Sequence, residues 1–299
     1  MLNVDLIDLI EKDDITSLDS SYFSNDFSPK ELEHMFNALA LNDSVKLLKL
    51  NNLKDILSNA ESLSDIIFFS TSIEELVICN TSESNDLLVR IRESIARSDR
   101  LETLRLNQLK MQSSGIEAIS QIVIQNSSIK TLDLSHQAIN RPYLKELSEV
   151  LEKNKFITSL ILNNTQLNSS DLKNLALCLQ TNETLDNLSL SHNGLTYSLM
   201  LPLIESSHKL ISIDLSYNKL DQYFATLFAR SFKTHTEISS IDLSNNKISD
   251  VGAAMIARHA EHLTLLKNLD MSSNGITKIG GYFVDKALKS IGKPDSFKI

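Results

Sequence analysis

Few residues in this sequence have the types and spacing that catalysis or metal binding requires. His259 and His262 are three residues apart in a predicted helix, which places both imidazoles on one face, but the sequence puts no third ligand beside them. Cys79 and Cys178 belong to no CxxC or Cys/His pattern typical of disulfide frameworks or zinc sites. There is no glycine-rich phosphate loop, GxSxG elbow or HExxH helix. We therefore expect no catalytic residue, no metal, no cofactor and no enzymatic activity.

The charge balance narrows the classes of partner. The 299 residues include 38 acidic and 29 basic ones, which gives a formal net charge of −9. A nucleic-acid-binding surface needs an excess of basic side chains, so we expect no nucleic-acid partner and a basic protein partner instead. Asp5 and Asp8 interrupt the apolar N-terminal stretch, which argues against a general secretory signal. No apolar run approaches the roughly 18 residues of a membrane span, so we expect a cytosolic protein.

The elements that position the side chains follow a repeated apolar pattern. An apolar residue is followed by others three and five positions later, as in Val45, Leu48 and Leu50. The pattern recurs every 28 residues, apart from one interval of 25. Such regularity over nine units indicates a repeat architecture. The units start at Val45, Ile73, Leu101, Ile129, Ile157, Leu185, Leu210, Ile238 and Leu266.

Each unit predicts one strand followed by one helix. The last two apolar residues of the pattern are two apart, so a strand points both to the same face. Strands lie about 4.8 Å apart and helices need roughly 10 Å, so stacked units curve, with a parallel sheet on the concave side and helices on the convex side. After each motif the apolar spacing becomes helical, and in the fourth unit the expected buried stripe is Tyr143, Leu147, Val150 and Leu151.

The last four units carry an asparagine three positions after the last apolar residue. The full unit is then LxxLxLxxNxL, for example residues 238–248. We expect this amide to lie inside the turn and to bond backbone groups that the bend leaves unpaired. Earlier units have other residues there, so we expect less regular turns and lower local stability in the N-terminal half. The asparagines are Asn193, Asn218, Asn246 and Asn274, and the residues in their place are Leu53, Thr81, Leu109, Gln137 and Thr165.

This motif resembles the leucine-rich repeat family, and its 28-residue period with a helix after each motif resembles the ribonuclease-inhibitor-like subclass. The resemblance covers residues 45–291 and implies an α/β solenoid in the form of a horseshoe. We expect an N-terminal cap at 1–44 that contains a degenerate repeat, the nine-repeat solenoid at 45–291, and a C-terminal tail at 292–299.

Two local signals refine this organisation. Ser28, Pro29 and Glu31 predict a helix start with a serine cap and a reciprocal glutamate inside the N-terminal region. The unit from Leu185 is three residues short and contains Pro202 in its helical part, which predicts a truncated helix.

The candidate binding residues project from positions 5 and 8 of the units, toward the concave face and its rim. Position 5 gives an acidic row in the C-terminal half, which a basic partner would neutralise; the alternative is that aspartate is common in this motif and stays solvated. Ile161 is a large apolar side chain on an otherwise polar face, which suggests a contact. We expect partner binding by Lys49, Arg105, Asp133, His136, Ile161, Asn164, His192, Asp214, Tyr217, Asp242, Asn245 and Asp270.

The resemblance implies a protein-binding module. The composition, rich in Ser, Asn, Lys and Ile, and the absence of a general signal are similar to leucine-rich-repeat effectors of intracellular bacterial pathogens. We therefore expect a monomer that a specialised system secretes into the host cytosol, where it binds a host protein. The last four residues, with Phe297 third from the end, are weakly similar to type IV translocation tails.

Proteins with this type of repeat have two other functions that bear on this chain. A regulator of a small GTPase is the alternative, because a GTPase-activating protein shares this repeat class; Arg105 is the candidate contact, and the acidic tail of that protein is absent here. Ubiquitin ligases with leucine-rich repeats carry a separate catalytic domain after the repeats, so we do not expect that activity.

Overall fold

The computed structural model describes residues 10, 12, 15–22, 27–81, 83–137, 143–204, 206, 209–290, 292 and 298. The chain forms two compact units. The first unit holds the described residues up to 137 together with 154–157, and the second unit holds 143–153 and the described residues from 158 onward.

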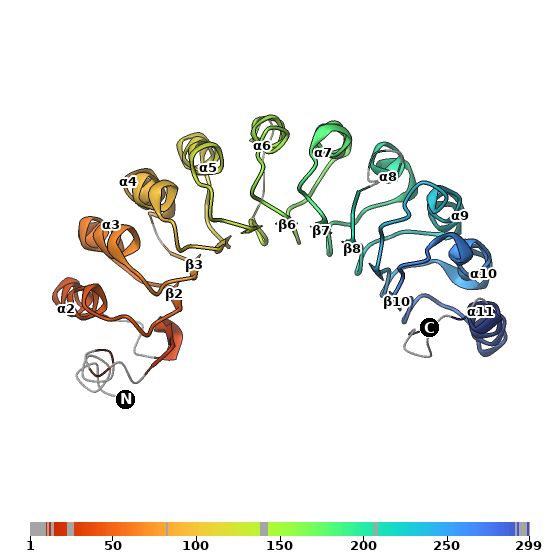
Figure 1. Cartoon of the computed structure of the whole chain (residues 1–299), viewed down its shortest axis with the longest axis horizontal. Helices are drawn as coiled ribbons and strands as arrows, with labels where there is room; N and C mark the ends of the chain where they lie inside the picture. Colours follow the sequence, from red (N-terminus) through yellow and green to blue (C-terminus); the bar gives the residue numbers. More distant parts are fainter. Residues whose placement is uncertain are drawn as a thin grey trace. The chain divides into compact units, whose positions relative to one another are not determined.

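The first unit alternates short strands with helices along the chain (Figure 1). Neighbouring strands from β1 to β5 pair in parallel, in sequence order. The strands are β1 (Ser17–Asp19), β2 (Leu47–Asn51), β3 (Glu75–Cys79), β4 (Thr103–Asn107) and β5 (Thr131–Asp133). The helices are η1 (Ser20–Tyr22), α2 (Pro29–Ala40), η2 (Ile56–Asn59), α3 (Ala60–Phe69), α4 (Ser84–Arg97) and α5 (Ser113–Gln125).

The second unit repeats the same arrangement. Its strands β6 to β10 also pair in parallel with their sequence neighbours. The strands are β6 (Ser159–Ile161), β7 (Asn187–Ser189), β8 (Ser212–Asp214), β9 (Ser240–Asp242) and β10 (Asn268–Asp270). The helices are α6 (Tyr143–Leu151), α7 (Ser169–Thr181), α8 (Tyr197–Ile204), α9 (Gln222–Ser231), α10 (Ser249–His259), η3 (Ala260–His262) and α11 (Lys278–Ser290).

The core of each unit lies between its sheet and its row of helices. In the first unit Leu48, Leu76 and Leu104 occupy matched register positions and are fully buried. Every strand of the nine predicted units starts two residues after the predicted motif start. Parallel strands on one side and helices on the other confirm the predicted α/β solenoid of leucine-rich repeats (Figure 1).

The predicted asparagine turns are confirmed in the second unit. Asn218 accepts hydrogen bonds from the backbone N–H groups of Asn193 and Leu195, both at 3.0 Å. Its amide group donates to the carbonyls of Leu190 at 3.1 Å and Leu215 at 2.9 Å. Each such side chain therefore links its own turn to the turn before it.

The first unit has other residues in place of the turn asparagine, and its less regular turns and lower local stability stay predictions. Gln137 donates to the Leu106 carbonyl at 3.1 Å, but its buried Oε1 has no partner. The buried Thr81 hydroxyl has no partner either. Thr165, at the same motif position in the second unit, does donate to the Leu162 carbonyl, at 2.8 Å.

A second set of asparagines, three residues before the motif, was not predicted. Asn126 donates to the carbonyls of Ile95 and Ser98, both at 2.9 Å, and accepts from the N–H of Ile129 at 2.7 Å. This amide therefore connects the end of one helix to the helix end before it and to the next strand. Equivalent bonds are made by Asn42, Asn154 and Asn182.

Helix starts are capped in two ways. Ser28 and Glu31 form the predicted reciprocal cap of α2, with Pro29 in the first turn. The N-cap residue of α5, Gln112, gives no side-chain bond; instead Asn85 of α4 accepts from the N–H groups of Gln112 at 3.2 Å and Gly115 at 2.8 Å. One helix thus caps the next, which the sequence alone did not indicate.

Three local predictions have mixed outcomes. Helix α8 spans Tyr197–Ile204 and contains Pro202, so the truncated helix is confirmed. In α6 the buried side chains are centred on Leu144, Leu147 and Leu151, so the expectation that Tyr143 and Val150 are buried is wrong. Both are half-buried, because the helix turns the positions one residue later, Leu144 and Leu151, toward the core.

The chain ends are described only in part. Residues 1–9 of the expected N-terminal cap and most of the tail at 292–299 lie outside the described residues. Lys298 is described: its N–H bonds the Leu269 carbonyl at 3.0 Å, and its carbonyl accepts from the Met271 N–H at 2.7 Å. Lys298 therefore pairs with the outer edge of β10. The boundaries of cap, solenoid and tail stay predictions.

None of the described helices is long and apolar enough to cross a membrane. Within the described residues, no group of three or more His, Cys, Asp or Glu side chains is arranged to hold a metal ion.

Candidate protein-binding surface

The candidate surface is the inner face of the sheet, by which we mean the face opposite the helices. Strand positions 3, 5 and 7 of each 28-residue repeat project there, while positions 4 and 6 are buried against the helices. In each of the nine repeats the residue at position 8, which follows the strand, has a backbone φ between 50° and 62°. The left-handed residues at position 8 are Asn52, Asn80, Gln108, His136, Asn164, His192, Tyr217, Asn245 and Ser273.

Position 8 is therefore a turn position as well as a rim position. Asparagine adopts a left-handed backbone at little cost, whereas most other side chains lose about 1 kcal/mol or more. Tyr217 is the bulkiest side chain at this position, and it is 52% exposed. A strained residue with an exposed aromatic ring points to a role outside the fold.

Aspartate at position 5 has a structural task that the sequence did not reveal. Its Oδ1 accepts a hydrogen bond from the backbone N–H two residues later, at 2.9 Å in Asp214, 2.8 Å in Asp242 and 3.0 Å in Asp270. Each carboxylate thus satisfies a donor at the point where the strand ends. Oδ1 of each aspartate is therefore engaged by the backbone, and only Oδ2 is available to other partners.

The Oδ2 atoms of this row differ in their partners. The Ser189 hydroxyl lies 2.7 Å from Asp214 Oδ2 and 2.7 Å from Asn163 Oδ1, so one proton serves two acceptors. Asp270 Oδ2 lies 3.2 Å from the Lys298 ammonium. In the described chain Asp242 Oδ2 has neither a hydrogen-bond donor nor a cation. Asp242 therefore presents an open carboxylate oxygen in the middle of the row.

The Lys298 contact has a measurable consequence. Burial alone would raise the pKa of Asp270, but donors from Ser272 and the Lys298 ammonium outweigh it and hold the pKa below 3.8. The last described residue of the chain thus places a lysine on the acidic row. It illustrates the type of group that this row accepts.

The first unit pairs its charged position-5 residues with one another. Lys49 bonds Asp19 at 2.7 Å, and Arg105 bonds Glu75 at 2.6 Å and Asp133 at 3.2 Å. Burial lowers the pKa of Arg105, but the bonds to the two carboxylates outweigh it and raise the pKa. Asp133 is only 7% exposed. Three predicted contact residues are therefore engaged within the face itself.

The second unit gathers the aromatic candidates. The rings of His192 and Tyr217 stack with centroids 4.1 Å apart and planes at 16°. The Tyr217 N–H bonds the Ser244 carbonyl at 2.9 Å, so the backbone of Tyr217 lies beside the segment that follows β9. The sequence placed both residues on one rim but did not show that they stack.

The remaining candidates are scattered. His136 and Asn164 are exposed, and Ile161 and Asn245 are half-buried. Cys79 projects from position 7 and donates to Asn51 Oδ1 at 3.3 Å, and burial raises the pKa of its thiol. A protonated, bonded thiol is a weak nucleophile, which agrees with a surface that binds rather than reacts.

A sheet face with an open carboxylate, a stacked aromatic pair and polar neighbours, carried on stacked strand–helix units, defines a protein-interaction module of the leucine-rich-repeat class. A family model described as the MHP1/HER1/GIP3 LRR domain matches residues 40–279. The chain therefore belongs to the MHP1/HER1/GIP3 family of leucine-rich-repeat proteins.

Two solved structures are similar to this chain at low identity. A Bacteroides fragilis protein is 16% identical, with 85% of this chain and 74% of that chain covered and a TM-score of 0.54. An internalin from Listeria monocytogenes is also 16% identical, with 98% and 88% covered and a TM-score of 0.48. No curated protein sequence matches this chain. At these identities the likeness concerns the fold alone.

Proposed function

We propose that this protein binds a basic segment of a partner protein on the inner face of its second unit. The open Oδ2 of Asp242 carries the proposal, because a half-buried carboxylate oxygen without a partner favours an arriving ammonium or guanidinium. The exposed face of Tyr217, in the preceding repeat, would take the aliphatic stem or the cation of the same side chain. Lys298 on Asp270 supports this choice, because a lysine already neutralises one member of the row.

The strain at Tyr217 adds a second argument. Asparagine occupies the same left-handed position in neighbouring repeats, for example at Asn164 and Asn245. A tyrosine there costs stability and gains nothing for the turn. Stability sacrificed at one exposed aromatic residue is typical of a binding surface.

The test is to compare three variants for binding. Asp242→Asn keeps an oxygen that accepts the Ser244 N–H, so it removes charge without removing the turn bond. The matched control is Glu237→Gln, an exposed carboxylate of the same unit. Partners captured by the wild-type protein from host-cell lysate are identified, and the affinity of the purified partner is measured for each variant. We expect Asp242→Asn to weaken binding about tenfold to a hundredfold and Glu237→Gln to leave it unchanged.

The third variant, Tyr217→Asn, separates binding from folding. It should raise the free energy of unfolding by up to about 1 kcal/mol and, at the same time, weaken the binding of the partner. Equal affinity for wild-type, Asp242→Asn and Tyr217→Asn proteins would eliminate this face as the binding site.

We also propose that the partner is a host protein and that the chain is a bacterial effector acting as a monomer in the host cytosol. The composition, rich in Ser, Asn, Lys and Ile, supports this. A reporter enzyme fused to the N-terminus and followed into host cells tests it. Transfer that requires a bacterial secretion system is the expected result, and transfer without one would contradict it.

The alternative of a small-GTPase regulator depends on Arg105. Its guanidinium is held by Glu75 and Asp133. Those ion pairs occupy the groups that a GTPase contact would use, so we prefer the binding module without chemistry of its own.

A further inference from the structure

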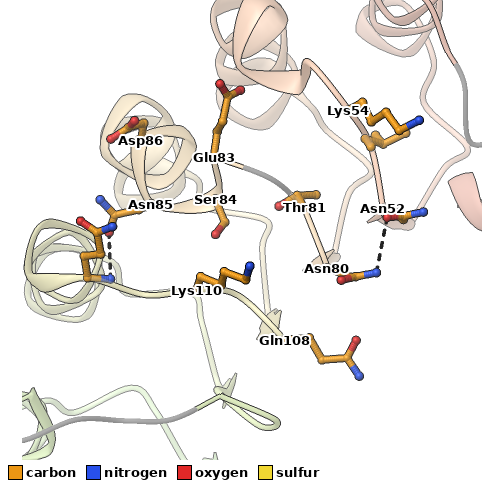
Figure 2. Close-up of a pocket in the computed structure, with 12 residues that line it drawn as sticks. Asn52, Lys54, Asn80, Thr81, Glu83, Ser84, Asn85, Asp86, Gln108 and Lys110 are labelled. Atoms are coloured by element: carbon orange, nitrogen blue, oxygen red, sulfur yellow. Dashed lines mark hydrogen bonds between the residues drawn. The ribbon is translucent and has the colours of Figure 1, made fainter.

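A polar cavity of about 550 Å³ lies in the first unit, and the position-8 residues Asn52, Asn80 and Gln108 are among those that line it. It is formed by the loops that follow β2, β3 and β4, at the carboxyl ends of these strands (Figure 2). These are the repeats in which the turn asparagine is replaced by another residue. A volume of this size is within the range of small-molecule sites.

The first turn of α4 forms one wall of the cavity. Its N-cap residue, Glu83, has a left-handed backbone with φ 57° and makes no side-chain cap bond. The first helical N–H bond is that of Leu87, to the Glu83 carbonyl. Ser84, Asn85 and Asp86 line the cavity, and their N–H groups lie at the start of the helix, at the positive end of its dipole.

One hydroxyl group next to this helix start points independently to a ligand. Thr81 is 6% exposed and its Oγ1 has no hydrogen-bond partner. Ser84, at the start of α4, is 3% exposed and lines the same cavity. Figure 2 shows the Thr81 hydroxyl directed toward Ser84, at the inner end of the cavity. A buried hydroxyl without a partner is costly, so a ligand atom that accepts from it would be stabilised.

The charges around the cavity favour an anion at this end. The Lys110 side chain reaches into the cavity below Thr81, whereas the carboxylates of Glu83 and Asp86 are directed away from Lys110 (Figure 2). The Asn85 side chain is committed to the start of α5. The groups that converge are therefore donors: two hydroxyls, one ammonium and helix N–H groups.

We propose that this cavity binds a phosphate group, free or carried by a small molecule. Several donors that approach from different sides match the oxygens of a phosphate better than the two oxygens of a carboxylate. Thr81 and Ser84 hold two of its oxygens, Lys110 neutralises it, and the N-terminus of α4 supplies the remaining N–H groups. The volume beyond these donors leaves room for the group that carries the phosphate.

The proposal is tested by titrating the full chain with inorganic phosphate, up to about 10 mM, in a calorimeter at constant ionic strength. Glycerol phosphate and acetate are titrated in parallel. We expect binding of inorganic phosphate or glycerol phosphate and none of acetate. Tighter binding of glycerol phosphate than of inorganic phosphate would indicate that the ligand is a small molecule that carries a phosphate group. The absence of phosphate binding, or acetate that binds as well, would overturn the proposal.

Variants locate the site. Lys110→Gln and Thr81→Val should each weaken phosphate binding at least about tenfold. Lys54→Gln is the matched control, because Lys54 lines the same cavity but its ammonium is directed away from Lys110 (Figure 2). Equal losses in Lys54→Gln and Lys110→Gln would show diffuse charge attraction and no site. Thr81→Val removes an unpaired hydroxyl at constant shape, so its melting temperature without phosphate should not fall, which keeps a binding loss interpretable.

Discussion

Replacing Asn218 by alanine tests the physical basis of the repeat most directly. The N–H groups of Asn193 and Leu195 both bond Asn218 Oδ1, and in the described chain they have no other acceptor. The three carbonyls that Asn218 serves are less affected. Leu190 keeps a bond from Asn193, Leu215 keeps one from Asn246, and Ser216 keeps one from the His192 N–H.

The magnitude follows from this difference. Two buried N–H groups lose their acceptor, at about 1–3 kcal/mol each, while the carbonyls keep a donor. Asn218→Ala should therefore lower the free energy of unfolding by about 2–6 kcal/mol. Gln137→Ala is the matched variant at the same motif position in the first unit. It removes a single bond and an unpaired oxygen, so we expect about 1 kcal/mol.

The assay is urea unfolding followed by far-UV circular dichroism, with the slope of the transition checked for each variant. Amide hydrogen exchange locates the effect: the N–H groups of Asn193 and Leu195 should lose protection before the rest of the second unit. Asn218→Ala with Asn246→Ala should cost more than the sum of the single changes, because the Leu215 carbonyl then loses both donors. If Asn218→Ala costs no more than Gln137→Ala, the interpretation of the asparagine turns is wrong.

Three further predictions concern other parts of the fold. Gly115→Ala would place a Cβ 2.5 Å from Asn85 Oδ1 and displace the cap of α5; urea unfolding should show a loss of about 1 kcal/mol that disappears in an Asn85→Ala background. Burial raises the pKa of Cys178 to about 12. The folded state therefore keeps a proton that the unfolded chain releases above about pH 9, so stability should fall as pH rises from 9 toward 12, and a stability–pH profile of Cys178→Val should lack this fall. Lys298→Gln should raise the pKa of Asp270 in a carboxyl NMR titration, and an unchanged pKa would show that Lys298 does not contact it in solution.

The position of each strand along the chain was predictable, because the same spacing of apolar residues recurs in every repeat. The motif start at Ile238, for example, places β9 at Ser240–Asp242 without ambiguity. Spacing also identified the turn asparagines, because an amide that recurs every 28 residues beside a strand has a backbone task. The same reasoning would have found Asn126 and its equivalents, which recur at the helix end with the same period.

Several features of the surface were not predictable from the motif. Arg105 was expected to meet a partner, but its carboxylates come from the two neighbouring repeats, 28 and 30 residues away. The left-handed backbone at position 8 could not be predicted, because that position is occupied by Asn, Gln, His, Tyr and Ser in different repeats. Lys298 belongs to no repeat motif, so nothing in the pattern indicates that it lies beside Asp270.

The order of apolar residues along the chain determines which strand positions are buried and which face outward, since a strand alternates its side chains and a helix does not. It therefore determined the fold, the repeat borders and the residues that share the inner face. Only the tertiary structure decided which of those residues are engaged with one another, because hydrogen bonds and ion pairs depend on distances between neighbouring repeats. That selection leaves Asp242 and the Tyr217–His192 pair open on the second unit, and it leaves the Thr81 hydroxyl without a partner in the first.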